Sequence, residues 1–141
     1  MPRKKARIIL DTNVLYAGLF SSKGASFQVL RAIEQSRLKM VISTTLLFEY
    51  EDILRRNQAD LGLSNQEIES TLDYFCMKSE HQKIYFLWRP YLSDPKDDHL
   101  LELAIASGTK FIVTHNTKDF VGMENFGIRA ITPKEVMEEI L

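Results

Sequence analysis

Short apolar runs alternate with amphipathic segments along the chain. Residues 8–10, 40–42 and 111–113 are continuously apolar, which is typical of strands buried on both faces of a parallel sheet. Residues 24–37 and 97–107 carry apolar side chains at helical spacing. The repeated succession of strand and helix predicts an α/β protein, a three-layer α/β/α sandwich with a mainly parallel central sheet and right-handed crossovers.

Capping signals mark where several helices begin. Ser43 precedes one amphipathic segment, and residues 64–67 and 132–135 each place a glutamate three residues after a hydroxyl side chain, the pattern of a capping box. The helix opened by Ser64 is predicted to run through Met77, and the last helix to Leu141. Two further strands are predicted, at residues 83–88 and 128–131.

Length and charge narrow the class of protein. A chain of 141 residues buries one sizeable core, so we expect a single domain, residues 1–141. Eighteen basic and 19 acidic side chains give a formal charge of −1, so any nucleic-acid partner must be held locally. No stretch approaches the ~18 apolar residues of a membrane helix, and the basic start lacks the apolar run of a signal peptide. We therefore expect a cytoplasmic protein with no membrane partner.

Polar side chains collect where the predicted strands end. In open α/β sheets, ligands bind beyond the carboxyl ends of the strands, because successive loops gather there. If the first strand and the strand at 111–113 are neighbours, acids from opposite ends of the sequence meet. Acids at such positions are also ordinary helix caps, so each one alone permits both interpretations. The residues concerned are Asp11, Glu49, Asp97, Asp98, Asn116 and Asp119.

A cluster of carboxylates suits a hard divalent cation. Mg²⁺ takes oxygen ligands, commonly one or two carboxylates together with waters and substrate phosphate. A zinc site uses histidine or thiolate, and the three histidines and single cysteine of this chain show no metal-ligand spacing. Composition and spacing by themselves thus indicate metal-assisted phosphate chemistry, and no more than that.

The ordered motifs resemble those of the PIN-domain nucleases. They are Ile-Ile-Leu-Asp-Thr-Asn at 8–13, then Glu49, then Asp-Pro-Lys-Asp-Asp at 94–98, then Ile-Val-Thr-His-Asn-Thr-Lys-Asp-Phe at 112–120. The match spans almost the whole chain and is strongest with the free-standing VapC-like toxins of toxin–antitoxin pairs. The resemblance implies a compact α/β/α fold, one or two Mg²⁺ or Mn²⁺ ions, and hydrolysis of RNA.

The resemblance assigns catalytic and metal-binding roles to particular acids. Asp11, Glu49 and Asp97 match the first three acids of the family. Asp97 is preferred to Asp98 because the stretch 101–104 keeps the family's register from the acid to the alanine. Asp98 is then a helix-start residue or an auxiliary ligand.

The fourth acidic position is where this chain departs from many relatives. Asn116 stands where an aspartate is frequent, and Asp119 lies three residues further on. An amide oxygen is a weaker ligand for Mg²⁺ than a carboxylate, so Asp119 is expected to supply the charge, with the choice between the two left open. Thr12, Asn13 and Thr114 are expected to orient the acids by hydrogen bonds.

The expected mechanism and partners follow from the same resemblance. A metal held by Asp11 and Asp97 activates a water for in-line attack at phosphorus, and Glu49 positions the metal or its water. The partners are an RNA substrate, an antitoxin protein and a second copy of the chain. The homodimer is also motivated by aromatic residues that one small core need not cover, namely Tyr74, Phe75, Tyr85, Phe86 and Trp88.

Two rival functions stay open at this point. One is a catalytically silent PIN-like domain that binds RNA or a protein, which Asn116 and the near-neutral charge favour. The other is a receiver-like or haloacid-dehalogenase-like phosphotransfer domain, which is disfavoured because residues 11–13 lack an aspartate two positions after Asp11. Three cationic loop residues at the acidic end could meet phosphate, although solvated loop charge is the favoured explanation for them: Lys23, His115 and Lys118.

Overall fold

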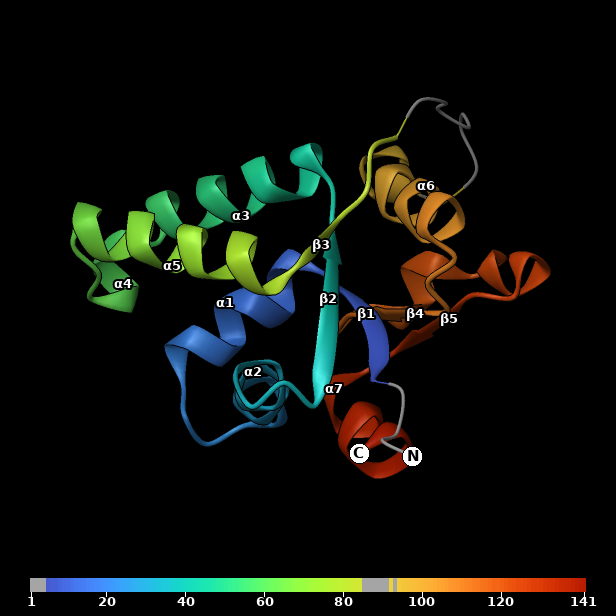
Figure 1. The fold of residues 1–141 in the computed structure, drawn as a ribbon, viewed down its shortest axis with the longest axis horizontal. Helices are drawn as coiled ribbons and strands as arrows, with labels where there is room; N and C mark the ends of the chain where they lie inside the picture. Colours follow the sequence, from blue (N-terminus) through green and yellow to red (C-terminus); the bar gives the residue numbers. More distant parts are fainter. Residues whose placement is uncertain (1–4, 85–91, 93) are drawn as a thin grey trace.

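The computed structural model describes residues 5–84, 92 and 94–141. Its centre is a sheet in which every strand pairs in parallel with its neighbours, in the order β3-β2-β1-β4-β5 (Figure 1). This arrangement confirms the predicted α/β class and puts the first strand beside the fourth. The strands are β1 (Ala6–Leu10), β2 (Leu38–Ile42), β3 (Glu80–His81), β4 (Phe111–Val113) and β5 (Arg129–Ile131).

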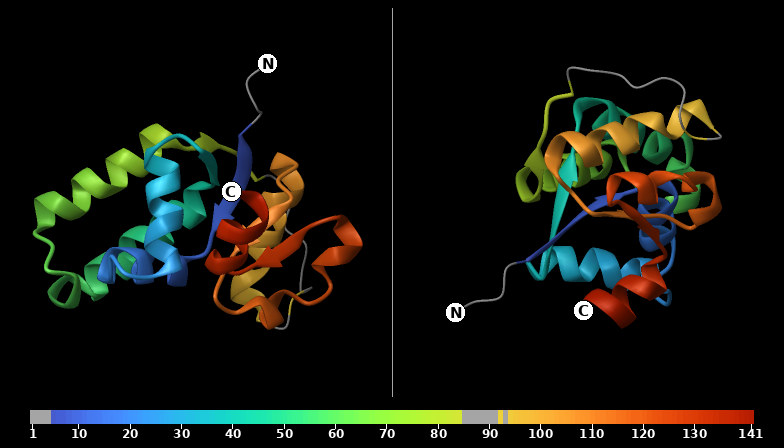
Figure 2. Two further views of the ribbon diagram at one scale, coloured as in Figure 1. Left: turned by 90° about the horizontal axis from the view of Figure 1, so that it is seen from below. Right: turned by 90° about the vertical axis from the view of Figure 1, so that its right-hand side faces the viewer.

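Helices cover both faces of the sheet. In the right-hand view of Figure 2, α2 and α7 lie on one side of the strands and α3 and α6 on the other. Helix α5 packs on α3, and α1 packs against both α2 and α3. Among the described helices, none combines the length and the apolar character that a membrane span requires. The helices are α1 (Thr12–Phe20), α2 (Ala25–Glu34), α3 (Thr44–Arg56), α4 (Gln58–Leu61), α5 (Asn65–Lys78), α6 (Asp98–Ser107) and α7 (Pro133–Glu135), which continues as a π-helical turn (Val136–Ile140).

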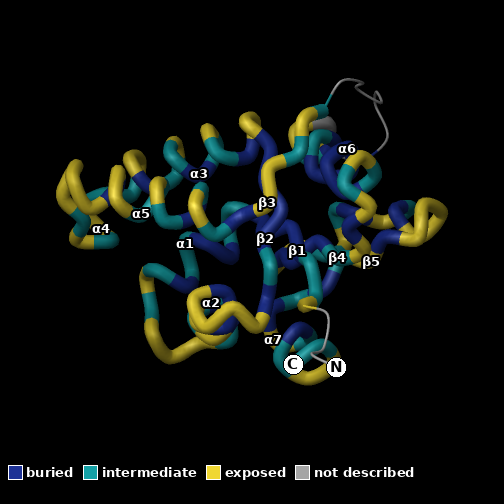
Figure 3. Tube along the Cα trace, in the orientation of Figure 1, coloured by how far each residue is buried: buried dark blue, intermediate teal, exposed yellow. Residues whose placement is uncertain are grey.

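The core follows the three inner strands of the sheet, β2, β1 and β4 (Figure 3). Ile8, Ile9 and Leu10 of β1 and Ile112 and Val113 of β4 are fully buried. Strand β1 lies between β2 and β4 and is covered by helices on both faces. A polar residue at any of positions 8–10 would therefore be buried. This explains why the predicted strands read as unbroken apolar runs.

The capping signals are confirmed, and one strand prediction is wrong. Ser64 and Thr132 each form a complete capping box. The third strand is β3, which pairs with Val41 and Ile42 of β2. The structure gives no strand at residues 83 and 84, and residues 85–88 of that prediction lie outside the described part of the chain. Both residues of β3 are exposed and polar, so no apolar pattern marks them.

Helix α1 was not predicted. Its sequence from Val14 to Phe20 is almost uniformly apolar, so it shows no alternation of faces by which a helix is recognised. Asp11 is its N-cap, and the Asp11 side chain accepts a hydrogen bond from the Thr12 backbone. The chain therefore passes from central strand to helix at the residue that sequence analysis marks as the first acid of the site.

Candidate active site

Both carboxylate oxygens of Asp11 are held in place. Oδ1 accepts from the Thr12 backbone nitrogen at 2.8 Å, and Oδ2 accepts from Thr114 Oγ1 at 2.8 Å. The Asp11 backbone nitrogen donates to Val113 at 2.9 Å, which continues the pairing of β1 with β4. Burial raises the pKa of Asp11, and the two hydrogen bonds oppose that rise. The first acid is thus a fixed, nearly buried group aimed beyond the sheet.

Asn13 joins the loop after β1 to the loop after β4. Its Nδ2 lies 3.4 Å from both Asp11 Oδ2 and Thr114 Oγ1, and its Oδ1 accepts from the His115 backbone nitrogen at 3.3 Å. The Asn116 backbone nitrogen donates to Thr114 Oγ1 at 3.1 Å. Thr12, Asn13 and Thr114 therefore all hydrogen-bond to Asp11, whereas Asn116 contributes its backbone nitrogen.

Asp11, Glu49 and Asp97 line one cavity of about 350 Å³. They come from the end of β1, from the middle of α3 and from the start of α6. Sequence-distant acids thus share one solvent-filled space at the carboxyl end of the sheet. The other residues that line it are Thr12, Asp52, Ile53, Arg56, Asp94 and Lys96.

Neighbouring carboxylates act on Asp97. Burial, followed by the charges of Asp11, Asp94 and Asp119, raises the pKa of Asp97 from 3.8 to about 6. His99 acts in the opposite direction. Asp119 does not line the cavity, yet its charge reaches Asp97, so all four predicted acids belong to one electrostatic cluster: Asp11, Glu49, Asp97 and Asp119.

Asp97 and Asp98 are adjacent in sequence and lie in different surroundings. Asp97 is the N-cap residue of α6, but its side chain makes no capping hydrogen bond and faces the cavity. Asp98 is 4% exposed, and its Oδ1 accepts from the Leu92 backbone nitrogen at 2.8 Å. Capping thus does not explain why the Asp97 side chain faces the cavity, whereas Asp98 holds the segment before the helix through its bond to Leu92.

Sequence analysis missed three residues of the site. His99 Nε2 lies 2.7 Å from Glu49 Oε2, and Arg56 and Lys96 line the cavity. Arg56 follows Glu49 by two turns on the same face of α3, and Lys96 directly precedes Asp97. Sequence spacing could therefore have placed both cations near the predicted acids. The contact of His99 with Glu49 joins residues 50 positions apart, and no spacing rule predicts it.

The three cationic loop residues are not part of the lining of the acidic cavity. Lys23, His115 and Lys118 are exposed, and none of them lines it. His115 Nε2 instead lies 3.0 Å from Ser26 Oγ. Among the described residues, the arginine and lysine that do line the cavity are Arg56 and Lys96.

The donor set of the cavity fits Mg²⁺ or Mn²⁺. The cavity offers carboxylate oxygens as donors, and burial together with the neighbouring carboxylates raises the pKa of Asp97. In the described part of the chain, no three Asp, Glu, His or Cys side chains converge into a ready-made metal group. Mg²⁺ usually keeps several waters and takes one or two carboxylates from the protein, so such a group is not required. Asp11 and Asp97 are the residues that would hold it.

The raised pKa of Asp97 predicts how stability depends on pH in EDTA. Between 3.8 and about 6 the folded chain binds more protons than the unfolded chain, so the free energy of unfolding falls as pH rises through that window. For Asp97 the loss is about 1–2 kcal/mol after allowance for screening by water. Thermal melts of the wild type and Asp97→Asn at several pH values measure it. Equal pH profiles for the two proteins would contradict the crowded site.

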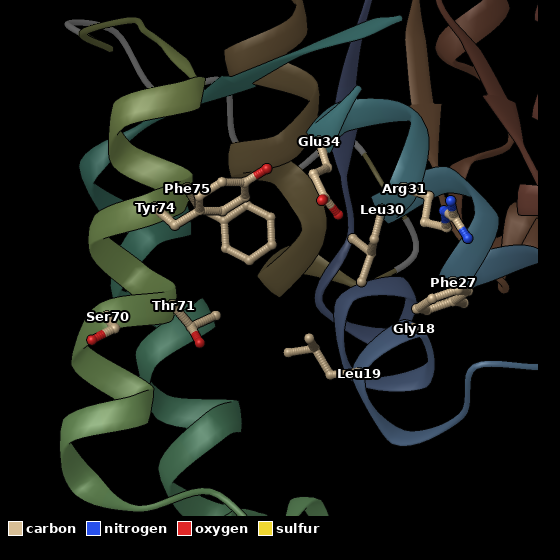
Figure 4. A pocket seen from close by; sticks show the side chains of 10 residues that line it. All are labelled: Gly18, Leu19, Phe27, Leu30, Arg31, Glu34, Ser70, Thr71, Tyr74 and Phe75. Carbon is tan, nitrogen blue, oxygen red and sulfur yellow. The ribbon is translucent and has the colours of Figure 1, made fainter. Parts of the chain in front are cut away.

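A second hollow, of about 400 Å³, lies between α5 and the pair α1 and α2 (Figure 4). Tyr74 and Phe75 of α5 face Leu30 and Glu34 of α2 across it. Glu34 is its one carboxylate among mainly apolar neighbours, so it offers no paired acids for hydrolysis. The smaller, acidic cavity is therefore the candidate active site.

Comparisons with known proteins agree with this geometry. The model of the PIN domain family matches residues 7–118, the span that holds β1, the acids of α3 and α6, and the loop after β4. A solved structure, the "Crystal structure of VapBC2 from Rickettsia felis bound to a DNA fragment from their promoter", is similar with a TM-score of 0.59 and 16% identity. The match covers 89% of this chain and 98% of that chain, and at this identity it shows the fold. No curated protein matches the sequence.

Proposed function

The chain belongs to the PIN domain family, and on this premise we propose that it is a ribonuclease that hydrolyses phosphodiester bonds of RNA with Mg²⁺ or Mn²⁺. The observation that carries the proposal is that Asp11, Glu49 and Asp97, from three separate elements, line one cavity. The family match also sets aside the receiver-like and dehalogenase-like alternatives.

The chain's own residues hold and orient the reacting groups. When bound, the ion activates water and offsets charge on the phosphate. Asp11 is fixed by Thr12 and Thr114, so its carboxylate need not reorganise during the reaction. His99 contacts Glu49 and limits the positions that this flexible side chain can take.

Two cations at the cavity suit an anionic substrate. Arg56 and Lys96 lie among the acids, and the exposed Arg56 is paired with Asp52 at 2.7 Å. An exposed ion pair of this kind is weak, so the guanidinium is free to exchange Asp52 for a phosphate oxygen. The two cations are thus placed to position the RNA backbone, while the acids provide the chemistry.

The direct test is RNA cleavage by the purified protein. An unstructured RNA incubated with the chain is expected to be cut in Mg²⁺ or Mn²⁺ and to stay intact in EDTA, because the acids alone offer no activated nucleophile. Cleavage that persists in EDTA and in Asp11→Asn would contradict the mechanism. RNA binding without any cleavage in either metal would favour the catalytically silent domain.

We further propose that the chain is the toxin of a toxin–antitoxin pair, with a small antitoxin protein as its partner. The similar solved structure is of VapBC2 bound to a DNA fragment from their promoter, which supports the proposal. Expression of the chain alone is expected to arrest growth, and co-expression of the product of the adjacent gene is expected to restore it. Growth arrest that Asp97→Asn still causes would contradict a nuclease toxin.

Self-association remains part of the proposal, although the aromatic residues of α5 no longer support it. Phe75 is buried and Tyr74 is half-buried, so neither supplies the exposed aromatic surface that the sequence suggested. Residues 85, 86 and 88 lie outside the described part of the chain. Sedimentation is expected to show a homodimer, and a monomer at tens of micromolar would contradict it. In the part of the chain that the structure describes, the large apolar side chains that are exposed are Phe20, Phe48, Met77, Val121 and Phe126.

A further inference from the structure

A third hollow, of about 410 Å³, opens where the last turns of α1 meet the starts of α2 and α7. Its walls are mostly apolar and include Tyr16, Phe20 and the buried Pro133. His115 and Lys134 also line it, and no aspartate or glutamate is among its lining residues. Its composition is thus the opposite of that of the acidic cavity.

A stacked aromatic pair forms one wall of this hollow. The rings of Tyr16 and Phe20 lie one helical turn apart on α1, with centroids 5.7 Å apart and an interplanar angle of 21°. Phe20 is nevertheless 59% exposed. A flat aromatic surface open to water is the platform on which nucleobases stack in proteins that bind single-stranded RNA.

The hollow begins close to Asp11. Asn13, which contacts Asp11, also accepts from the His115 backbone nitrogen, and His115 lines the hollow. On α1, Tyr16 lies one turn beyond Asn13 and Phe20 two turns beyond, roughly 5 and 10 Å along the helix axis. A polynucleotide with one phosphate at the acids would reach the aromatic pair by following α1 outward from Asn13.

The charge at the hollow suits a nucleotide. Lys134 is exposed and has only a surface contact of 3.8 Å with Glu138, and Lys23 adjoins the lining residue Gly24. Such a surface pair is weak and gives way to a phosphate. The apolar wall would receive a base, while the two lysines would meet the backbone phosphate beside it.

We propose that this hollow is a base-binding subsite for one nucleotide of single-stranded RNA, next to the bond that is cut. The inference deepens the proposed ribonuclease function and rests on it. Because paired bases are stacked within a duplex and cannot enter, the subsite selects unpaired RNA. The adjoining acidic cavity performs hydrolysis, and the hollow holds the strand in register with it.

The first test separates binding from chemistry. Phe20→Ala is expected to raise KM for an unstructured RNA by roughly 5- to 100-fold and to leave kcat within about twofold, as loss of one stacked base predicts. Phe20→Trp is expected to keep the wild-type KM. Met77→Ala, which removes another large exposed apolar side chain, from α5, is the control. An unchanged KM in Phe20→Ala, in protein that cleaves normally, would overturn the subsite.

The second test adds charge without steric strain. A side chain at Gly24 meets nothing within 4 Å of its Cβ, and Gly24 is the uncapped N-cap of α2, where both Asp and Asn are favoured. Gly24→Asp is expected to raise KM several-fold by repelling phosphate, whereas Gly24→Asn keeps it. Equal effects of the two substitutions would show that no phosphate lies there.

A third measurement does not depend on cleavage. Titration of the chain with the four nucleoside monophosphates in EDTA is expected to shift the ring NMR signals of Tyr16, Phe20 and His115. In Phe20→Ala, the signals of Tyr16 and His115 are expected to stay unshifted. Those shifts in a chain that cleaves no RNA would support the subsite and contradict the ribonuclease function. Shifts confined to residues of the acidic cavity, or none at all, would overturn the subsite.

Discussion

Asp97→Asn is expected to lower the rate of RNA cleavage by roughly 100-fold or more, and Asp98→Asn to leave most of it. Asp97 shares the cavity with Asp11 and Glu49, so its loss removes a carboxylate from the proposed metal site. Asp98 is directed to the Leu92 backbone, where an asparagine oxygen can still accept the hydrogen bond. Initial rates with saturating Mg²⁺ on one unstructured RNA measure the difference.

Fold and charge are controlled separately in this experiment. Asp73→Asn removes an exposed acid from α5 and is expected to change nothing. Circular dichroism of each variant shows whether the fold persists, and Asp98→Asn is the variant expected to lose stability, because its side chain is buried. If Asp98→Asn abolished cleavage in folded protein while Asp97→Asn remained active, the assignment of the third acid would be off by one position.

Millimolar Mg²⁺ is expected to raise the melting temperature of the wild type by roughly 5–10 °C. An ion that binds the folded site at 100 times its Kd contributes about 2.7 kcal/mol, and each kcal/mol moves the midpoint of a chain of this size by about 2–4 °C. Asp11→Asn and Asp97→Asn are expected to gain much less from the ion. Differential scanning calorimetry in EDTA and in Mg²⁺ gives the comparison.

In EDTA, where no ion can bind the acids, loss of one carboxylate is expected to stabilise the fold. Asp97→Asn should melt higher than the wild type, by an amount worth ~1 kcal/mol, because it relieves repulsion from Asp11, Asp94 and Asp119. Arg56 and Lys96 line the same cavity and already offset part of that repulsion, which keeps the gain small. If Mg²⁺ had no effect on the wild type and the variants melted no higher in EDTA, the acids would not form one site, and the silent domain would be the better interpretation.

The fold was predictable where burial or capping left a local pattern. Strand β4 coincides with the apolar run at 111–113, and Ser64 and Thr132 open helices because their hydroxyls and a glutamate three residues later satisfy backbone groups within one turn. Strand β3 lacked such a pattern, because both of its residues are polar and exposed at the edge of the sheet. Helix α1 lacked one because it is apolar nearly all round.

The site was predictable as a set of acids but not as an arrangement. The resemblance singled out Asp97 over Asp98, and the structure places the first in the cavity and the second against the Leu92 backbone. It gave no indication of the contact between Glu49 and His99, which depends on how α3 packs against α6. Contacts between helices that are distant in sequence follow from tertiary packing, for which a single sequence carries no local signal.

The hydrogen bond between Thr114 and Asp11 joins residues 103 positions apart, and this has a consequence for the order of events during synthesis. The ribosome completes β1 and α3 long before β4 exists, so a growing chain has its first carboxylate without the hydroxyl that fixes it and its central strand with one edge unpaired. Domains made of such distant pairings fold late, as a unit. If the chain is the ribonuclease proposed above, it is expected to stay inert while it is still attached to the ribosome, surrounded by ribosomal and messenger RNA, and to gain its activity only when nearly the whole chain has been made.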